Sequence, residues 1–149
     1  FACLLQWDNI YYQEPTEEYI SPKTTVRVGL VQWQMRSYKT LDDLFEQVEF
    51  FVDSVSGYQS DFVLFPEYFN APLMARFNDA SESQAIRGLA RYTDEIRERF
   101  INLAIRYNIN IITGSMPLIK EDGLLYNVGF LCRRDGTYEM YEKLHVTTD

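Results

Sequence analysis

The sequence predicts an α/β domain in which helices pack on a mixed β-sheet. Apolar runs of strand length alternate with segments whose apolar residues recur at helical spacing, and a hairpin pattern follows them. This succession is typical of a layered α/β fold. The chain has 149 residues, 46% of them hydrophobic, and is therefore long enough to bury a core of its own.

Two strands are predicted in the first half of the chain. Residues 26–33 are apolar on both faces except at Arg27 and Gln32, as expected of a strand buried inside a sheet. Residues 61–65 form a second apolar run. This run ends at Pro66, because proline lacks the N–H group that a sheet ladder needs.

Helices are predicted after each of these strands. Thr40 is suited to the N-cap of the first helix, with Asp43 at N3 as in a capping box, and Gly57 follows its last apolar position. A short helix is predicted around 83–91, and Thr93 is predicted to cap a further one. The inner faces of the two longer helices consist of Leu41, Leu44, Phe45, Val48, Phe51, Val52 and Val55, and of Ile96, Phe100, Leu103, Ala104 and Tyr107.

The last part of the chain predicts a third strand and a hairpin. Residues 109–114 form the strand, and residues 125–132 and 137–143 form the two arms of the hairpin. The segment Arg133-Arg134-Asp135-Gly136 joins the arms, and Asp-Gly between two strand patterns is a strong turn signal. Before the first strand, residues 1–25 are polar and acidic, so an extension or linker from a preceding segment is expected there.

Composition argues against several classes of partner. The formal net charge is −8, whereas phosphate binding needs clustered basic residues, so no nucleic acid is expected. The one basic cluster, Arg97, Arg99 and Arg106, alternates with acidic residues as on a solvated helix face. No apolar run approaches the roughly 20 residues of a membrane span, so no membrane is expected. Two cysteines make neither a disulfide framework nor a zinc site, which favours a reduced, cytoplasmic setting.

Glu67 and Lys143 each follow an apolar strand and are the candidate catalytic residues. Open α/β sheets place ligand sites at the carboxyl ends of their strands. The aromatic neighbours Phe65, Tyr68 and Phe69 are expected to desolvate Glu67, which raises a carboxyl pKa toward the range of a general base. A lysine at such a point can stabilise an oxyanion or favour a thiolate. Taken singly, a surface glutamate and an edge-strand lysine that opposes aggregation are the commoner interpretations.

Five segments, in order along residues 26–149, match the pattern of a known enzyme family. They are Val28-Gly29-Leu30-Val31-Gln32, Phe65-Pro66-Glu67-Tyr68-Phe69, Ile112-Thr113-Gly114-Ser115, Leu125-Tyr126-Asn127-Val128-Gly129-Phe130 with Arg134-Asp135-Gly136, and Tyr141-Glu142-Lys143-Leu144-His145. Together they resemble segments of the nitrilase, or carbon–nitrogen hydrolase, superfamily. One such motif is weak, whereas five in the same order are specific.

The resemblance implies half of an α-β-β-α sandwich and a Glu–Lys–Cys triad. By analogy, Glu67 is the general base, Lys143 stabilises the tetrahedral intermediate, and a cysteine forms a thioester acyl-enzyme. The expected reaction is hydrolysis of an amide or nitrile carbon–nitrogen bond in a small-molecule amide substrate, with no cofactor and no metal. Tyr68, Arg76 and His145 are candidates for the substrate pocket. Members of the family are usually dimers or larger, so a homo-oligomer is expected.

The nucleophile of the triad is expected outside the 149 residues. Cys132 lies in an apolar strand pattern, where a buried structural thiol is expected, and Cys3 lies in the extension. In the family the cysteine follows the lysine by some tens of residues. Residues 26–149 are therefore expected to be the N-terminal portion of a longer domain, inactive alone. Some bacterial family members resemble fusions with an N-terminal acetyltransferase domain, so residues 1–25 are expected to be the tail of a preceding domain of that kind.

Two other functions stay open. A metal-dependent phosphoesterase of a similar sandwich fold would hold Mg²⁺ with carboxylate, amide and imidazole ligands. Asn127 and His145 are available for this, although no dense set of carboxylates lies near Glu67 in the sequence. The other alternative is a non-catalytic fragment that acts through protein contacts.

Overall fold

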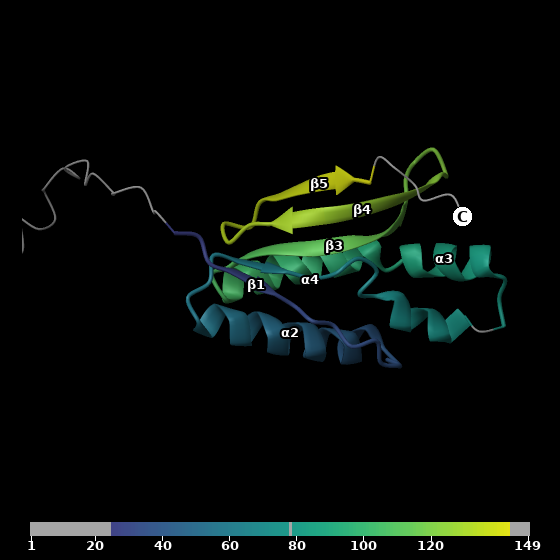
Figure 1. Ribbon diagram of the computed structural model, residues 1–149. Helices are drawn as coiled ribbons and strands as arrows, with labels where there is room; N and C mark the ends of the chain where they lie inside the picture. The colour runs from purple at the N-terminus through teal and green to yellow at the C-terminus, as the bar shows by residue number, and fades with distance from the viewer. Residues whose placement is uncertain (1–24, 78, 144–149) are drawn as a thin grey trace, which may run out of the picture.

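The computed structural model describes residues 25–77 and 79–143, which form a five-stranded sheet with packed helices (Figure 1). The strands are β1 (Val28–Leu30), β2 (Phe62–Leu64), β3 (Asn110–Ile119), β4 (Leu125–Cys132) and β5 (Tyr138–Glu142), in that order across the sheet. The helices are α2 (Leu41–Gly57), α3 (Glu82–Ala90) and α4 (Thr93–Arg106), with the 3₁₀ helix η1 (Ala71–Phe77). The predicted α/β fold with a mixed sheet and flanking helices is confirmed. The expectation for residues 1–25 falls, except at Thr25, outside the described residues.

Strand direction determines which strand ends meet. β1, β2 and β3 are parallel, and β4 and β5 follow as antiparallel neighbours. Because the chain reverses twice, β5 runs in the same direction as β1 to β3. The carboxyl ends of β2 and β5 therefore lie at the same end of the sheet. Glu67 follows the first of these strands and Lys143 follows the second.

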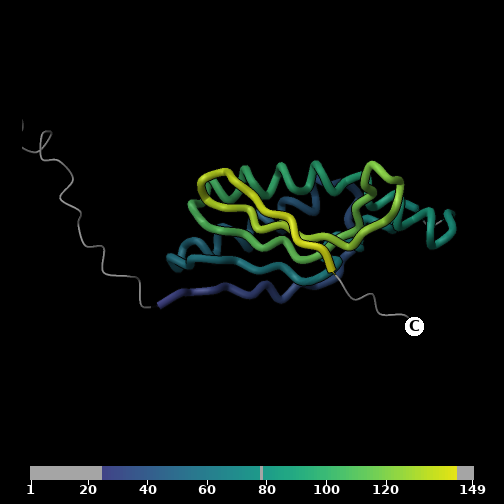
Figure 2. Tube along the Cα trace, turned by 90° about the horizontal axis from the view of Figure 1, so that it is seen from above, coloured from purple at the N-terminus to yellow at the C-terminus, as the bar shows by residue number. Residues whose placement is uncertain are grey.

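The two faces of the sheet differ in what covers them. Helices α2 and α4 pack on one side, here called the covered face, as Figure 2 shows. Side chains alternate between faces along a strand, so Val63, Val128 and Phe130 point to the covered face and are fully buried. Across the described residues no helix lies on the opposite side, the open face. Val28 and Leu30 of β1 lie on the open face and are 49% and 73% exposed.

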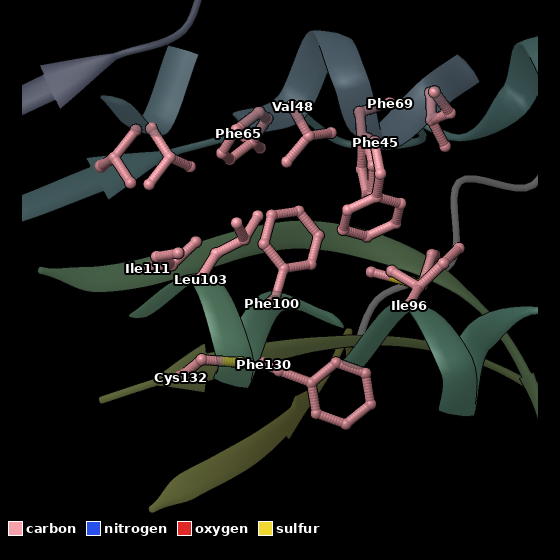
Figure 3. Packing of buried hydrophobic residues seen from close by; sticks show 14 of the residues in the cluster. Phe45, Val48, Phe65, Phe69, Ile96, Phe100, Leu103, Ile111, Phe130 and Cys132 are labelled. Carbon is pink, nitrogen blue, oxygen red and sulfur yellow. The ribbon is translucent and has the colours of Figure 1, made fainter. Parts of the chain in front are cut away.

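An aromatic cluster fills the space between the sheet and the helices (Figure 3). The Phe100 ring of α4 has centroid distances of 5.3, 5.2 and 5.5 Å to Phe45, Phe65 and Phe69. Such tilted and edge-on aromatic pairs contribute beyond their buried area. Phe65 and Phe69 stand on either side of Glu67 in the sequence, so the core fixes the backbone that carries this carboxylate.

Helix starts were predicted with mixed success. Thr40 and Asp43 form the expected capping box, in which each side chain binds the other residue's backbone N–H. The prediction that Thr93 caps α4 is wrong. Tyr92 holds the N-cap position in a helical conformation, because only two residues separate α3 from α4. Thr93 is instead the first residue of α4, and its buried hydroxyl donates to the carbonyl oxygen of Pro117.

Two strand predictions were also wrong. The segment 26–33 was expected to be buried on both faces, but only Val28–Leu30 forms a strand, and it lies at the edge of the sheet with its open-face side chains in solvent. The strand expected at 109–114 continues to Ile119. It does so through an irregularity between Ile112 and Ser115, where Gly114 adopts a φ of +70°.

The basic cluster of α4 is paired with carboxylates. The pairs are Arg97 with Asp94 and Glu98, Arg99 with Asp42 and Glu95, and Arg106 with Glu49. Arg106 is exposed, as predicted for a solvated helix face. Arg97 and Arg99 are only 20% and 31% exposed, and their guanidinium groups also lie over aromatic rings on the core side. In the part of the chain that the structure describes, no helix has the length and apolar character needed to cross a membrane.

Candidate active site

Glu67 lies just beyond the carboxyl end of β2, and backbone hydrogen bonds fix its position. The N–H of Phe65 donates to the carbonyl oxygen of Ile112 (2.9 Å), and the N–H of Tyr68 donates to that of Ser115 (2.8 Å). Tyr68 itself has a φ of 53°, a left-handed turn that directs the chain away from the sheet. The segment around Glu67 is thus tied to β3 on both sides of the carboxylate.

Gly114 makes this close approach possible. A Cβ atom at position 114 would lie 2.2 Å from the carbonyl oxygen of Pro66, and the φ of +70° is one that side chains with a Cβ rarely adopt. A glycine is therefore required where β3 passes the backbone of Pro66 and Glu67.

Three side chains donate hydrogen bonds to one oxygen of Glu67. The Ser115 hydroxyl (3.1 Å), the Asn127 amide nitrogen Nδ2 (2.9 Å) and the Lys143 ammonium (3.1 Å) all contact Oε1. The donors come from β3, from β4 and from the residue after β5, so three successive strands converge on this carboxylate. The structure thus brings together the two sequence-predicted residues Glu67 and Lys143, which are 76 positions apart.

The same alternation that buries the core places these donors on the open face. Val128 and Phe130 point to the covered face, so Asn127 and Gly129 point the other way. The Tyr141 ring packs over Gly129, where a Cβ atom would lie 2.2 Å from the ring. Lys143, two residues beyond Tyr141, continues on that face. Its backbone N–H donates to the carbonyl oxygen of Asn127 (2.9 Å).

The pKa of Glu67 is lowered, which corrects the prediction that desolvation raises it. The hydrogen bond from Lys143 is the largest cause, and that from Asn127 is next. Both outweigh desolvation, because the Glu67 side chain is 48% exposed on the open face. Glu67 is therefore a carboxylate at neutral pH. The pKa values of Tyr68 and Tyr141 are raised, first by burial and then by the Glu67 charge, so both hydroxyls stay protonated beside it.

Two of the other sequence-predicted residues, Arg76 and Cys132, do not join this cluster. Arg76 is exposed in η1, and its guanidinium donates to the hydroxyl of Tyr92 (3.0 Å). Cys132 is buried on the covered face, as predicted for a structural thiol, and burial raises its pKa to about 12. His145 and Cys3 lie outside the described residues.

A groove of about 720 Å³ lies next to η1, away from Glu67. Met35 and Arg36 line one side, and the η1 residues Ala71, Met74 and Phe77 line the other. Neither Glu67 nor Arg76 is among the residues that line this groove.

Sequence reasoning did not assign Ser115 and Asn127 to the site. Asn127 was considered only as a metal ligand, yet its amide nitrogen donates to Glu67. Both residues lie in segments that carry the family resemblance, and strand alternation would have placed Asn127 on the face opposite Val128. In residues 25–77 and 79–143, no group of three or more His, Cys, Asp or Glu side chains could hold a metal ion.

Sequence comparison establishes the family. Residues 27–149 match the carbon–nitrogen hydrolase family, and the chain belongs to that family. Over 148 residues the chain is 38% identical to the probable hydrolase YhcX of Bacillus subtilis (strain 168). The match covers 99% of this chain and 29% of that relative, so the chain spans less than a third of the relative's length.

Solved structures of the same superfamily share the fold. A carbon–nitrogen hydrolase from Helicobacter pylori G27 aligns with a TM-score of 0.66 at 19% identity, over 82% of this chain and 40% of that one. The amidase of Nesterenkonia sp. AN1, captured with acrylamide added to its active-site cysteine, aligns with a TM-score of 0.65 at 18% identity. The alignment covers 84% of this chain and 46% of that one. Nit3 of Saccharomyces cerevisiae, from branch 10 of the nitrilase superfamily, aligns with a TM-score of 0.63 at 20% identity. The alignment covers 80% of this chain and 44% of that one.

Proposed function

We propose that this chain is part of an enzyme that hydrolyses a non-peptide carbon–nitrogen bond in a small amide. The observation that carries the proposal is the 3.1 Å contact between the Lys143 ammonium and Glu67 Oε1, at the strand ends of an α/β sheet. Family membership supports the reaction class, and the Bacillus subtilis relative is described as a hydrolase. One of the solved neighbours is an amidase from Nesterenkonia sp. AN1, which supports small amides as the substrate class.

The proposed roles follow from the charge and position of the two residues. Glu67 accepts the proton of a cysteine thiol, and the thiolate forms a bond to the carbonyl carbon of the amide. Lys143 stabilises the negative oxygen of the tetrahedral intermediate. The carbon–nitrogen bond then breaks as Glu67 returns the proton to the departing ammonia or amine, leaving a thioester. A water molecule, losing its proton to Glu67, attacks the thioester, and the acid departs as the thiol regains a proton.

The nucleophilic cysteine of this scheme is proposed to lie outside the 149 residues. Cys132 is on the covered face, and its pKa of about 12 keeps the thiol protonated at neutral pH. We accordingly propose that residues 26–149 are the N-terminal portion of the catalytic domain and are inactive alone. Tyr68, beside Glu67, is proposed to line the substrate site, with Arg76 and His145 as further candidates. A cytoplasmic homo-oligomer is the proposed state of the whole protein.

The proposal is tested by replacing Glu67 in the intact protein. Glu67→Gln keeps the size of the side chain and removes the proton acceptor. We expect kcat/KM for short aliphatic amides, measured as ammonia release, to fall by roughly 10³-fold. Glu142→Gln is the matched control, because Glu142 adjoins Lys143 in sequence but pairs with Lys120, and it should retain activity close to that of the wild type.

Two outcomes contradict the proposal. Wild-type activity in Glu67→Gln would remove Glu67 from the base role. Loss of amidase activity after incubation with a chelator would instead favour the metal-dependent alternative, which no contact in the described residues supports.

A further inference from the structure

The hydrogen bonds to Glu67 are unevenly distributed over its two oxygens. Oε1 accepts all three donors, from Ser115, Asn127 and Lys143. Among the residues that the structure describes, no side chain donates a hydrogen bond to Oε2. A carboxylate held by one oxygen has a defined orientation and leaves the other oxygen accessible.

We propose that Ser115 and Asn127 are positioning residues, which hold Oε1 of Glu67 so that Oε2 is the atom that accepts the proton. This inference rests on the proposed function, because it assigns a geometry to the base of that reaction. In the step concerned, the S–H bond of the thiol breaks, the new O–H bond forms at Oε2, and the electron pair stays on sulfur.

Each positioning residue binds the site twice. Ser115 accepts the N–H of Tyr68 with its carbonyl oxygen (2.8 Å) and donates its hydroxyl to Glu67. Asn127 accepts the N–H of Lys143 with its carbonyl oxygen (2.9 Å) and donates its amide to Glu67. Ser115 thus fixes the backbone next to Glu67, and Asn127 fixes the backbone of Lys143. The side chains of both residues donate to Oε1.

The orientation of the Asn127 amide supports a role beyond packing. Its oxygen Oδ1 is buried and has no hydrogen-bond partner in the described structure. A buried acceptor without a partner is unfavourable, and an apolar side chain would avoid it. Rotating the amide by 180° would satisfy neither group, since Oδ1 would then face the carboxylate. The contact with Glu67 therefore determines which way this amide points.

Neutral donors are suited to this task during the reaction. Lys143 must direct its charge to the oxyanion as the tetrahedral intermediate forms, which weakens its contact with Glu67. Serine and asparagine carry no charge and do not titrate near neutral pH, so their hydrogen bonds to Oε1 persist at that stage. They hold the carboxylate while the ammonium acts on the substrate.

The test uses the intact protein and two independent readouts. The ionisation of Glu67 is followed by ¹³C NMR of its carboxyl carbon, assigned with Glu67→Gln, and kcat and KM are measured for a short aliphatic amide. Asn127→Asp keeps the shape but replaces the donor with a second carboxylate, Asn127→Ala removes the donor, and Ser115→Ala removes the hydroxyl. Asn110→Ala is the matched control, because Asn110 lies in β3 but binds the carbonyl oxygen of Asp61.

We expect the Glu67 midpoint to move to higher pH in all three variants, because each loses a donor that favours the charged form. The shift should be largest for Asn127→Asp and smallest for Ser115→Ala. We also expect kcat to fall by roughly 10-fold or more with little change in KM. The Asn110→Ala control should leave the midpoint unchanged.

An unchanged midpoint in folded Asn127→Asp and Ser115→Ala would overturn the inference, as would wild-type kcat in both. Where Asn127→Ala does not fold, the isosteric Asn127→Asp carries the test. The NMR result stands apart from the proposed function. If Glu67→Gln keeps full activity, the proposed function fails, even if the Glu67 midpoints shift in the other variants. If Glu67→Gln is inactive but no midpoint shifts, the proposed function stands and only this inference fails.

Discussion

The covered and open faces of one sheet differ in what they contribute, because one holds the apolar core and the other holds the candidate site. On the covered face, Val63, Val128 and Phe130 have no solvent exposure and pack toward the helices. On the open face, Leu30 is 73% and Tyr141 43% exposed, yet that face carries the donors that converge on Glu67. Burial of apolar area supplies most of the free energy of folding. The core therefore fixes the strands, and the strands position polar side chains on a face that contributes little burial of its own.

The largest effect that would test this comparison is expected from Phe100→Ala. Phe100 is fully buried and contacts three other phenylalanine rings, so its removal leaves a cavity in the core. We expect the free energy of unfolding of the 149-residue chain to fall by about 3–5 kcal/mol, measured by urea denaturation.

Leu30→Ala is the control on the open face, and it should change the free energy of unfolding by only about 0.5 kcal/mol or less. Equal losses in the two variants would show that the faces do not differ as described. Repeating both in the intact protein sharpens the comparison, because a much larger loss for Leu30→Ala there would mean that another layer covers the open face.

Gly114→Ala tests the link between the two faces and should have the second-largest effect. The added Cβ atom would clash with the Pro66 carbonyl oxygen. The alanine would also have to adopt a positive φ, which is unfavourable for a residue with a Cβ. We expect a loss of about 1–3 kcal/mol in the free energy of unfolding, together with displacement of Glu67 from its donors. Gly57→Ala is the control, because it has no neighbour within 4 Å of the new Cβ at the end of α2. A Gly114→Ala variant as stable as Gly57→Ala would contradict the described approach of β3 to Pro66.

The smallest effect is expected in the acid dependence of stability. The folded-state pKa of Glu67 is lowered, so its contribution to stability is present above the ordinary glutamate pKa of about 4.3 and is lost as the pH falls through the folded value. Lys143→Met removes the largest cause of the lowering. Its stability, measured by urea denaturation between neutral pH and pH 3, should therefore decline slightly less with acid than that of the wild type. A steeper decline in Lys143→Met than in the wild type would contradict the lowered pKa of Glu67.

Features set by neighbouring residues in the sequence, such as caps and turns, were predictable. Features that depend on which elements pack or pair in space were not. Thr40 and Asp43 form a cap within four residues, and the hairpin turn at Asp135-Gly136 is equally local. Leu30 is exposed because no helix covers the open face in the described residues, and nothing in the sequence of β1 indicates this. The contact from Ser115 to Glu67 spans 48 positions and exists because Gly114 lets β3 pass Pro66. The direction of the Glu67 pKa shift likewise follows from donors on three strands.

The position of Lys143 on the chain has a consequence for the lifetime of the site. Strand β5 is exposed along its whole length, and within residues 25–77 and 79–143 it pairs with β4 alone. Segments with few buried contacts open locally at lower free energy than the core. Fraying of this single strand would separate the ammonium from the carboxylate while the aromatic cluster stays packed. We therefore expect the charged pair to open at a lower free energy than the folded domain, before the core unfolds.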